Sequence, residues 1–310
     1  MSEKELITLK DFLKEKVDDD LSALIWEFAA QSVPLREEFP TRRGKAASEN
    51  IYGEQQIKLD IWTNDFFIDK IGKTGLVGTL LSEESPEPVE LGGGPFNITM
   101  DPLDGSSNVE SNNLFGTIVG IYKNTKIPAK GEKQVAAFYK LYGPITTLVL
   151  AVKGKVYEFV KQRKGTVEYV LSKEDLKIPE PKIYGVGGNP DKWIPEFYFF
   201  VRLLRNKGLK LRYGGSFVGD FNQVLFHGGF FGYPSFINKP SGKLRLLFEG
   251  NPMAYICETA GGGSSTGTRS ILKVKPEKLD HRIPIYVGNK ELIEELENLF
   301  KAAQDARESF

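Results

Sequence analysis

The sequence is poor in residues that carry thiol and imidazole chemistry. Its 310 residues include one cysteine, Cys257, and two histidines, His227 and His281. A single thiol excludes a disulfide, and a thiol–disulfide switch, within one chain. The two histidines lack the spacing of a metal-ligand pair, and an isolated histidine is more often a packing or surface residue. We therefore assign neither histidine to a functional site.

The sequence also lacks an excess of either charge and any long apolar run. Lys plus Arg and Asp plus Glu both total 41, so no global field attracts nucleic acid or an anionic membrane. No run approaches the roughly 18 apolar residues of a membrane span, and the first residues carry no secretory apolar block. We expect a cytoplasmic protein that binds neither nucleic acid nor membrane.

What the sequence does contain is an alternation of helix and strand patterns, which indicates a mixed α/β protein. We expect helices at 18–31, about 49–71, 194–208, about 218–227, 252–260 and from about 290. We expect β-structure at 76–85, 96–101, 115–122, 145–160, 182–188, 242–249 and 283–288. The polar stretch 175–182 carries two prolines and is the candidate boundary between a domain of residues 1–180 and one of 181–310.

Two predicted helices show apolar stripes. In the first, Leu21, Leu24, Ile25 and Phe28 align. In the second, the stripe consists of Ile57, Ile61, Ile68 and Ile71, and Asp60 and Asn64 lie on or beside it. A buried acid costs free energy unless it has a partner, so Asp60 needs an explanation.

Acidic residues gather at the ends of predicted strands. They are the pair Glu83 and Glu84, the motif Asp101-x-x-Asp104, and Glu249. Carboxylates at strand ends collect at one edge of an α/β sheet, where such proteins bind ligands. Oxygen ligands without nearby His or Cys favour Mg²⁺ or Mn²⁺ over zinc.

Small residues follow these acids directly in "DPLDGSS". Gly105 allows a ligand to approach the backbone, and Ser106 and Ser107 leave amides at a loop-to-helix start free to bind an anion. Metal ligands beside an anion cradle suit a phosphate ester. An acidic turn with ordinary helix capping is the alternative reading of this motif.

The second acidic region is "GKLRLLFEGNPMAYICETAGGG". Glu249 ends a predicted strand, Asn251 is the predicted N-cap and Pro252 the first helical residue. Along the strand Lys243 and Arg245 alternate with leucines, which indicates a basic face. That face is either solvated or a second phosphate grip, and the pattern alone leaves both readings open.

Together these segments resemble the class I fructose-1,6-bisphosphatases, with sedoheptulose-1,7-bisphosphatases beside them. The resemblance covers about residues 18–300 through "KLDIWTND", "LLSEES", "DPLDGSSN", "GTIVGIY", "LYG", "RYGGS", "YP" and "GKLRLLFEGNPMAY". "DPLDGSS" alone is shared with the wider inositol-phosphatase superfamily. A glutamate before Asn-Pro selects the sugar-bisphosphatase branch, because the wider group has Trp-Asp there.

The resemblance implies a fold and a set of roles. The fold is a layered αβαβα sandwich with mixed sheets, and the reaction is metal-dependent hydrolysis of a phosphate monoester without a phosphoenzyme. Asp60 and Glu84 resemble the pair that positions and deprotonates water. The implied ligands of two to three Mg²⁺ (or Mn²⁺) ions are Glu83, Asp101, the Leu103 carbonyl, Asp104, Glu249 and, for a third ion, Glu54. The implied substrate contacts are Asp104, Gly105, Ser106, Ser107, Arg212, Tyr213, Ser216, Tyr233 and Lys243, with Phe217 and Leu244 lining the sugar.

The implied substrate is fructose 1,6-bisphosphate, converted to fructose 6-phosphate in gluconeogenesis. Arg212 resembles the arginine that reaches a neighbouring subunit's site, which implies a homo-oligomer, usually a tetramer. Alternatives are a sedoheptulose or dual-specificity bisphosphatase and, less favoured by the complete set of acids, a sugar-phosphate sensor without turnover. The family's 6-phosphate Asn and Tyr are replaced here by Gly187 and Pro190.

A further departure concerns regulation. Where the vertebrate-type AMP site has Gly-Thr-Gly-Glu, residues 18–21 read "DDDL", and Pro95-Phe96 replaces its Lys-Tyr pair. Acids repel a phosphate, so we predict that AMP leaves bisphosphatase activity unchanged. Phosphate release measured over a millimolar range of AMP checks this, and saturable inhibition would contradict it.

Overall fold

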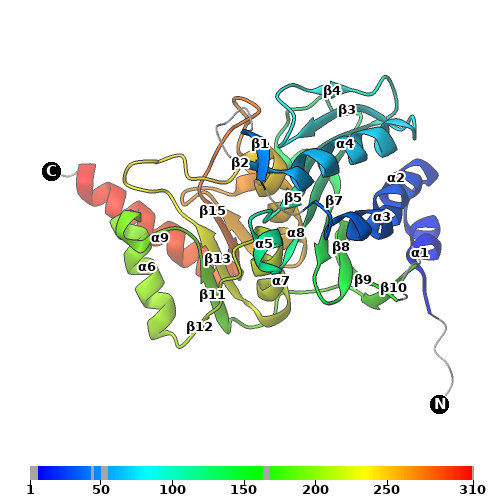
Figure 1. Ribbon diagram of the computed structural model, residues 1–310. Helices are drawn as coiled ribbons and strands as arrows, with labels where there is room; N and C mark the ends of the chain where they lie inside the picture. Colours follow the sequence, from blue (N-terminus) through cyan, green and yellow to red (C-terminus); the bar gives the residue numbers. More distant parts are fainter. Residues whose placement is uncertain (1–5, 43–44, 50–54, 163–167, 309–310) are drawn as a thin grey trace, which may run out of the picture.

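The computed structural model of the chain describes residues 6–42, 45–49, 55–162 and 168–308 and arranges them in five layers (Figure 1). An outer helical layer packs on an eight-stranded sheet, two helices lie between this sheet and a five-stranded one, and two more helices cover the far side. The predicted αβαβα sandwich is confirmed. None of the helices in the described part of the chain is both long and apolar enough to cross a membrane.

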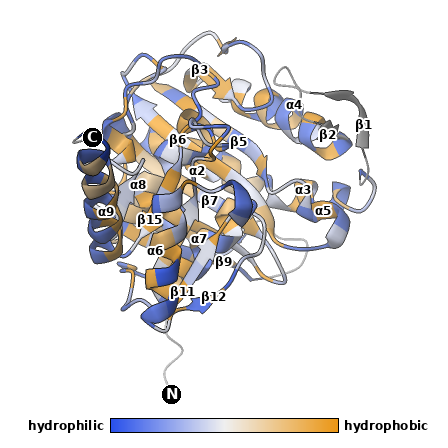
Figure 2. Ribbon diagram, turned by 90° about the vertical axis from the view of Figure 1, so that its left-hand side faces the viewer, coloured by the Kyte–Doolittle hydropathy of each residue, from blue (hydrophilic) through white to orange (hydrophobic). Residues whose placement is uncertain are grey.

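The helices follow these layers. The first outer layer contains α1 (Leu9–Lys16), α2 (Asp19–Ala30), α3 (Ser32–Glu38) and α4 (Lys58–Gly72). The central helices are α7 (Phe217–His227) and α8 (Asn251–Thr259), the last layer contains α6 (Pro195–Asn206) and α9 (Lys290–Glu308), and the short α5 (Asn108–Ser111) follows the DPLDGSS motif. Helix α9 buries Leu292, Ile293 and Leu296 and is otherwise largely hydrophilic (Figure 2).

Both sheets are mixed. The first has the order β10 (Tyr169–Lys173), β9 (Lys155–Lys161), β8 (Thr146–Val152), β7 (Gln134–Tyr142), β6 (Phe115–Lys123), β5 (Phe96–Asp104), β3 (Val77–Ser82), β4 (Val89–Glu90), with β3 and β5 parallel. The second has the order β12 (Lys210–Leu211), β11 (Ile183–Val186), β13 (Gly229–Tyr233), β15 (Ile285–Gly288), β14 (Gly263–Ser265). A short pair, β1 (Lys45–Glu49) with β2 (Gln55–Ile57), is separate from both.

The central layer joins the two halves of the chain. Its core combines residues of β6 to β9 with residues of α7, α8, β13 and β15. The predicted boundary at residue 180 falls in the extended segment between β10 and β11 and stays a prediction. Because α7 and α8 bury side chains against the first sheet, the two halves share one core.

Two predicted elements differ from the structure. The helix expected from about residue 49 begins at Lys58, since Gln55–Ile57 is a strand, and its core-facing stripe consists of Leu59, Thr63, Phe67 and Ile71. The strand expected at 242–249 is instead a π-helical turn over Leu246–Gly250 that runs into α8. Asn251 is therefore the first residue of α8 and not its N-cap.

A buried lysine ties the outer helices to the first sheet. Lys140 on β7 is fully buried and its Nζ donates to the carbonyl of Phe28, 2.8 Å away in the last turn of α2. The same nitrogen lies 5.6 Å from the ring centroid of Phe67 and 5.5 Å from that of Tyr142. Burial holds the pKa of Lys140 well below its ordinary value, because the charged form is poorly solvated there.

This lysine predicts a pH dependence of folding stability. The unfolded chain keeps the proton up to about pH 10.4, whereas the folded chain releases it earlier, so raising the pH within that window stabilises the wild type. Lys140→Met should remove this slope, so that the stability difference between variant and wild type changes between pH 7 and 9.5. Urea unfolding at both pH values measures it, with the exposed Lys133→Met as matched control. Parallel pH dependence of wild type and Lys140→Met would contradict the prediction.

Candidate active site

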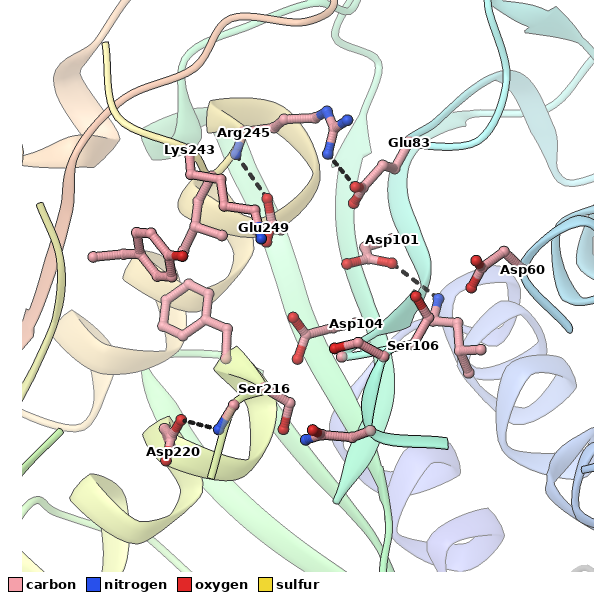
Figure 3. A pocket seen from close by; sticks show the side chains of 18 of the residues that line it. Asp60, Glu83, Asp101, Asp104, Ser106, Ser216, Asp220, Lys243, Arg245 and Glu249 are labelled. Carbon is pink, nitrogen blue, oxygen red and sulfur yellow. Dashed lines mark hydrogen bonds and ion pairs between the residues drawn. The ribbon is translucent and has the colours of Figure 1, made fainter. Parts of the chain in front are cut away.

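One cavity of about 570 Å³ collects nearly all the residues expected from the sequence (Figure 3). It lies where β3, β5, α4, α7 and the π-helical turn converge. Its lining includes Asp60, Glu83, Glu84, Asp101, Leu103, Asp104, Gly105, Ser106, Ser107, Tyr213, Ser216, Phe217, Tyr233, Lys243, Leu244 and Glu249. Of the expected residues, Arg212 is absent from this lining, and Glu54 lies outside the described residues.

Three carboxylates from separate stretches meet in this cavity. One oxygen each of Glu83, Asp101 and Glu249 lies within 4.8 Å of the other two, and Asp104 lies beside them (Figure 3). Glu83 directly follows β3, where its amide donates to the Met100 carbonyl (3.0 Å). Such a group of oxygens suits a hard divalent cation.

A β-bulge turns Asp101 and Asp104 toward the same side. Residues three apart on a regular strand face opposite sides of the sheet. Here Asp101 pairs with Ile118 and Asp104 with Gly116, so three steps on β5 match two on β6. The extra residue, at the Pro102-Leu103 stretch, reverses one alternation and brings both carboxylates into the cavity.

The carboxylates repel one another in a buried space. Burial, followed by the charges of Glu83, Asp104 and Glu249, raises the pKa of Asp101 well above its usual value. Burial also raises the pKa of Glu249, and it raises that of Asp104 to about 7 although backbone amides of α7 oppose it. A cation between these groups would relieve both the repulsion and the lost solvation.

Arg245 supplies part of the compensating charge. Its side chain is 4% exposed, forms an ion pair with Glu83 and, through Nε, a 3.0 Å ion pair with Asp280. Its backbone amide donates to Glu249 Oε2 at 2.7 Å (Figure 3). Lys243 and Arg245 therefore do not form the face of a strand, but both side chains line the cavity, and Arg245 is paired within the acidic cluster. Lys243 instead lies over the ring of Tyr233, 5.7 Å from its centroid.

One carboxylate oxygen retains free binding capacity. Glu83 Oε2 is buried and has no hydrogen-bond partner among the residues that the structure describes. A buried acceptor without a partner costs free energy. Together with the oxygen-only donor set, this atom fits a bound divalent cation and gives no support to zinc.

Asp60 and Glu84 line the same cavity as the carboxylate cluster. Asp60 is buried in the first turn of α4 and faces the cavity, although the helix begins later than expected. One turn on, Asn64 accepts from Ser82 Oγ (2.6 Å) and donates to Ser85 Oγ (3.3 Å). These bonds tie α4, which carries Asp60, to the segment 82–85, which carries Glu84.

The Gly105–Ser107 turn lines the cavity with small residues. Gly105 has φ +78°, and a Cβ there would lie 2.3 Å from Ser216 Cβ, so glycine is required. Among the described residues, the amides of Ser106 and Ser107 have no acceptor. Free amides at such a turn can bind phosphate oxygens.

Aromatic and cationic groups line the other end of the cavity. Burial, then the neighbouring Tyr233, raises the pKa of Tyr213 to about 12, so its hydroxyl stays a donor at neutral pH. Lys243 is the lysine at this end. Arg212 lies outside the lining: it is exposed and its Nη1 donates to Gln223 Oε1 at 3.3 Å.

The structure explains why glycine stands at position 187, where the sequence resemblance leads one to expect an asparagine. A Cβ on Gly187 would lie 2.4 Å from the Tyr233 ring, so glycine makes room for that tyrosine. Asn189 is exposed and its side chain accepts from the Asp191 amide (3.0 Å), capping a short 3₁₀ turn (Pro190–Lys192). The Asn189 side chain is therefore engaged in a local turn.

Sequence and structure comparisons agree with this geometry. Residues 30–174 match the family profile "Fructose-1-6-bisphosphatase, N-terminal domain", and residues 178–301 match the C-terminal domain of the same family. The class 1 fructose-1,6-bisphosphatase of Natronomonas pharaonis is 44% identical over 92% of this chain and 99% of its own length. That of Methanocorpusculum labreanum is 39% identical over 94% of this chain and 90% of its own.

The holo form of Leishmania major fructose-1,6-bisphosphatase superposes with a TM-score of 0.89 at 30% identity, over 97% of this chain and 100% of its own. Both halves of the chain match, and the carboxylates of the cavity come from both. The chain therefore belongs to the fructose-1,6-bisphosphatase family of phosphatases.

Proposed function

We propose that this protein hydrolyses the 1-phosphate of fructose 1,6-bisphosphate to give fructose 6-phosphate and phosphate, with Mg²⁺ (or Mn²⁺) as cofactor. One observation carries the proposal: Glu83 just after β3, Asp101 on β5 and Glu249 on the π-helical turn meet in one cavity. The same cavity is lined by the Gly105–Ser107 turn and by Tyr213, Tyr233 and Lys243. The name shared by its relatives supplies the substrate.

The chain's own residues divide the work of the reaction. Glu83, Asp101, Asp104, Glu249 and the Leu103 carbonyl would hold two ions, and Glu54 is the candidate for a third. When bound, such ions polarise the phosphoryl group and lower the pKa of water. Asp60 and Glu84 would orient the attacking water and accept its proton, and Gly105–Ser107 would hold the 1-phosphate.

The far end of the cavity would recognise the rest of the substrate. Tyr213, Tyr233 and Lys243 would bind the 6-phosphate, while Ser216, Phe217 and Leu244 would line the sugar. Arg212 points outside its own cavity, which supports a role in a neighbouring subunit's site within a homotetramer. We also propose a cytoplasmic role in gluconeogenesis. The buried thiol of Cys257, which has no second cysteine to pair with, is compatible with that compartment.

Removal of single carboxylates tests this function. Asp104→Ala and Glu249→Ala should each lower Mg²⁺-dependent kcat/KM by about 100-fold or more, since metal-site changes commonly cost at least that much. Asp60→Asn should lower kcat by about 10²–10⁴-fold, as expected for loss of a general base. Glu291→Ala, an exposed acid on α9, is the matched control and should leave activity unchanged.

Phosphate release from fructose 1,6-bisphosphate and sedoheptulose 1,7-bisphosphate, with and without Mg²⁺, is the assay. Turnover of both sugars would identify a dual-specificity enzyme, and preference for the heptulose would replace the proposed substrate. Tight binding without release of phosphate would indicate a sensor. Full Mg²⁺-dependent turnover by Asp104→Ala and Glu249→Ala would refute the metal assignments.

The raised carboxylate pKa values predict how Mg²⁺ stabilisation depends on pH. Burial raises the pKa of Asp104 to about 7, from about 3.9 in the unfolded chain, so the stability that this group contributes in its protonated form is lost as the pH rises through that range. Mg²⁺ binds the deprotonated carboxylates and restores stability. The increase in Tm caused by Mg²⁺ should therefore be larger at pH 8 than at pH 5.5. Thermal unfolding in EDTA and in Mg²⁺ measures both increments, and equal increments would count against the proposed site.

A further inference from the structure

Two segments of the cavity that are proposed to bind the phosphates of the substrate are linked to each other by a hydrogen bond. The first contains Gly105–Ser107 and continues into Asn108, and the second contains Tyr213–Ser216. Asn108 Nδ2 donates to the Gly214 carbonyl (2.9 Å) and to the Leu114 carbonyl (2.8 Å). The chain positions of the two segments differ by about a hundred residues, so this bond is a tertiary link between them.

Close backbone packing reinforces that link. The space that a Cβ of Gly105 would fill is occupied by Ser216, and the space beside Gly215, at φ +84°, is occupied by Asn108 Oδ1 at 3.2 Å. Each segment thus places a glycine against a side chain of the other. Neither segment can shift along the cavity without a clash or a lost hydrogen bond.

Asp220 holds the second segment from the opposite side. Its carboxylate accepts from the Gly214 amide (2.6 Å) through one oxygen and from the Gly215 amide (3.1 Å) through the other. Figure 3 shows Asp220 beside Ser216, with one of its hydrogen bonds drawn. The residue is buried, and burial raises its pKa to about 6, so the carboxylate is largely charged at pH 7. Two charge-assisted bonds to adjacent amides fix the backbone direction just after Tyr213.

Helix α7 connects this clamp to the carboxylate cluster. Asp220 lies in its first turn, and the Val218 amide of the same turn donates to Asp104 Oδ2 at 2.8 Å. One helix end therefore contacts a proposed metal ligand and the loop that carries Tyr213. The positions of the two phosphate-binding regions are set by the same few residues.

We propose that Asp220 and Asn108 are positioning residues that fix the separation between the two phosphate-binding regions and so select a substrate with two phosphates at that separation. This inference rests on the proposed function. Neither residue needs to touch the reacting phosphorus. A substrate with one phosphate uses the first region alone and gains nothing from the fixed separation.

Substitution at Asp220 tests this selection. In Asp220→Asn the amide nitrogen faces one of the two glycine amides, so one bond is replaced by a donor–donor contact. KM for fructose 1,6-bisphosphate should rise about 10-fold or more, the equivalent of one lost charge-assisted hydrogen bond, while kcat changes less than about 3-fold. The kcat/KM for p-nitrophenyl phosphate, which has one phosphate, should change less than about 2-fold.

Two further variants keep the test decisive. Asn108→Ala removes the bond to Gly214 from the other side. It should likewise raise KM for fructose 1,6-bisphosphate and leave kcat/KM for p-nitrophenyl phosphate nearly unchanged, and it serves as the test where Asp220→Asn fails to fold. Asn222→Ala is the matched control, because Asn222 also lies on α7 but its side chain accepts from the Tyr139 hydroxyl (2.8 Å), whereas the Gly214 and Gly215 amides donate to Asp220. Asn222→Ala should change kcat/KM for both substrates by the same factor or leave both values unchanged.

Each outcome bears on the inference. If Asp220→Asn and Asn108→Ala lower kcat/KM by the same factor for both substrates, or change it for neither, the positioning role is overturned. If the wild type releases no phosphate from fructose 1,6-bisphosphate, the proposed function fails instead. Calorimetry then decides the inference: Asp220→Asn must weaken binding of the bisphosphate and leave binding of inorganic phosphate unchanged.

Discussion

The main constraint on this structure is that the fold brings several carboxylates together, where they repel one another. The backbone around these groups is hydrogen-bonded, so the carboxylates cannot move apart to reduce the repulsion. The groups are Glu83, Asp101, Asp104 and Glu249. The Asp101–Asp104 bulge and the π-helical turn at Glu249 are the local irregularities that aim these groups inward. Arg245 offsets part of the charge through Glu83, and the rest is available to a divalent cation. Burial strengthens both the repulsion and the attraction to such an ion.

Much of the fold could be predicted because its signals are local. Helix α2 has acids at its start and a clear apolar stripe, and Asp18 caps it through the Leu21 amide. The β-structure expected at 145–160 is the hairpin of β8 and β9, which turns at Gly154 with φ +74°. Strands β7 and β13 and helices α1 and α3 were not anticipated. In β7 nearly every residue is buried, including Lys140, so the sequence shows no regular alternation of apolar and polar residues.

The site was predictable in composition and less so in geometry. The DPLDGSS motif and the acids after β3 mark the cavity because their chemistry lies in single short stretches. Arg245 was misread as part of a basic strand face, since alternation with leucines is also what a strand produces. Asp220 and Asn108 had no signal of their own. Asp220 binds the nearby amides of Gly214 and Gly215, and Asn108 binds the Gly214 carbonyl 106 residues away, but no sequence motif marks either contact. Asn64 was noted beside a helix stripe, but its bonds to Ser82 and Ser85 appear only once α4 is placed.

The shared central layer limits how the protein can move. Many enzymes enclose their substrates by rotating one domain about a hinge toward another. Here α7 and α8 bury apolar side chains against both sheets, so a hinge motion between the halves would open the core itself. The cavity is therefore a preformed binding site. Substrate entry and product departure must then use local rearrangement at the cavity mouth and not large-scale closure.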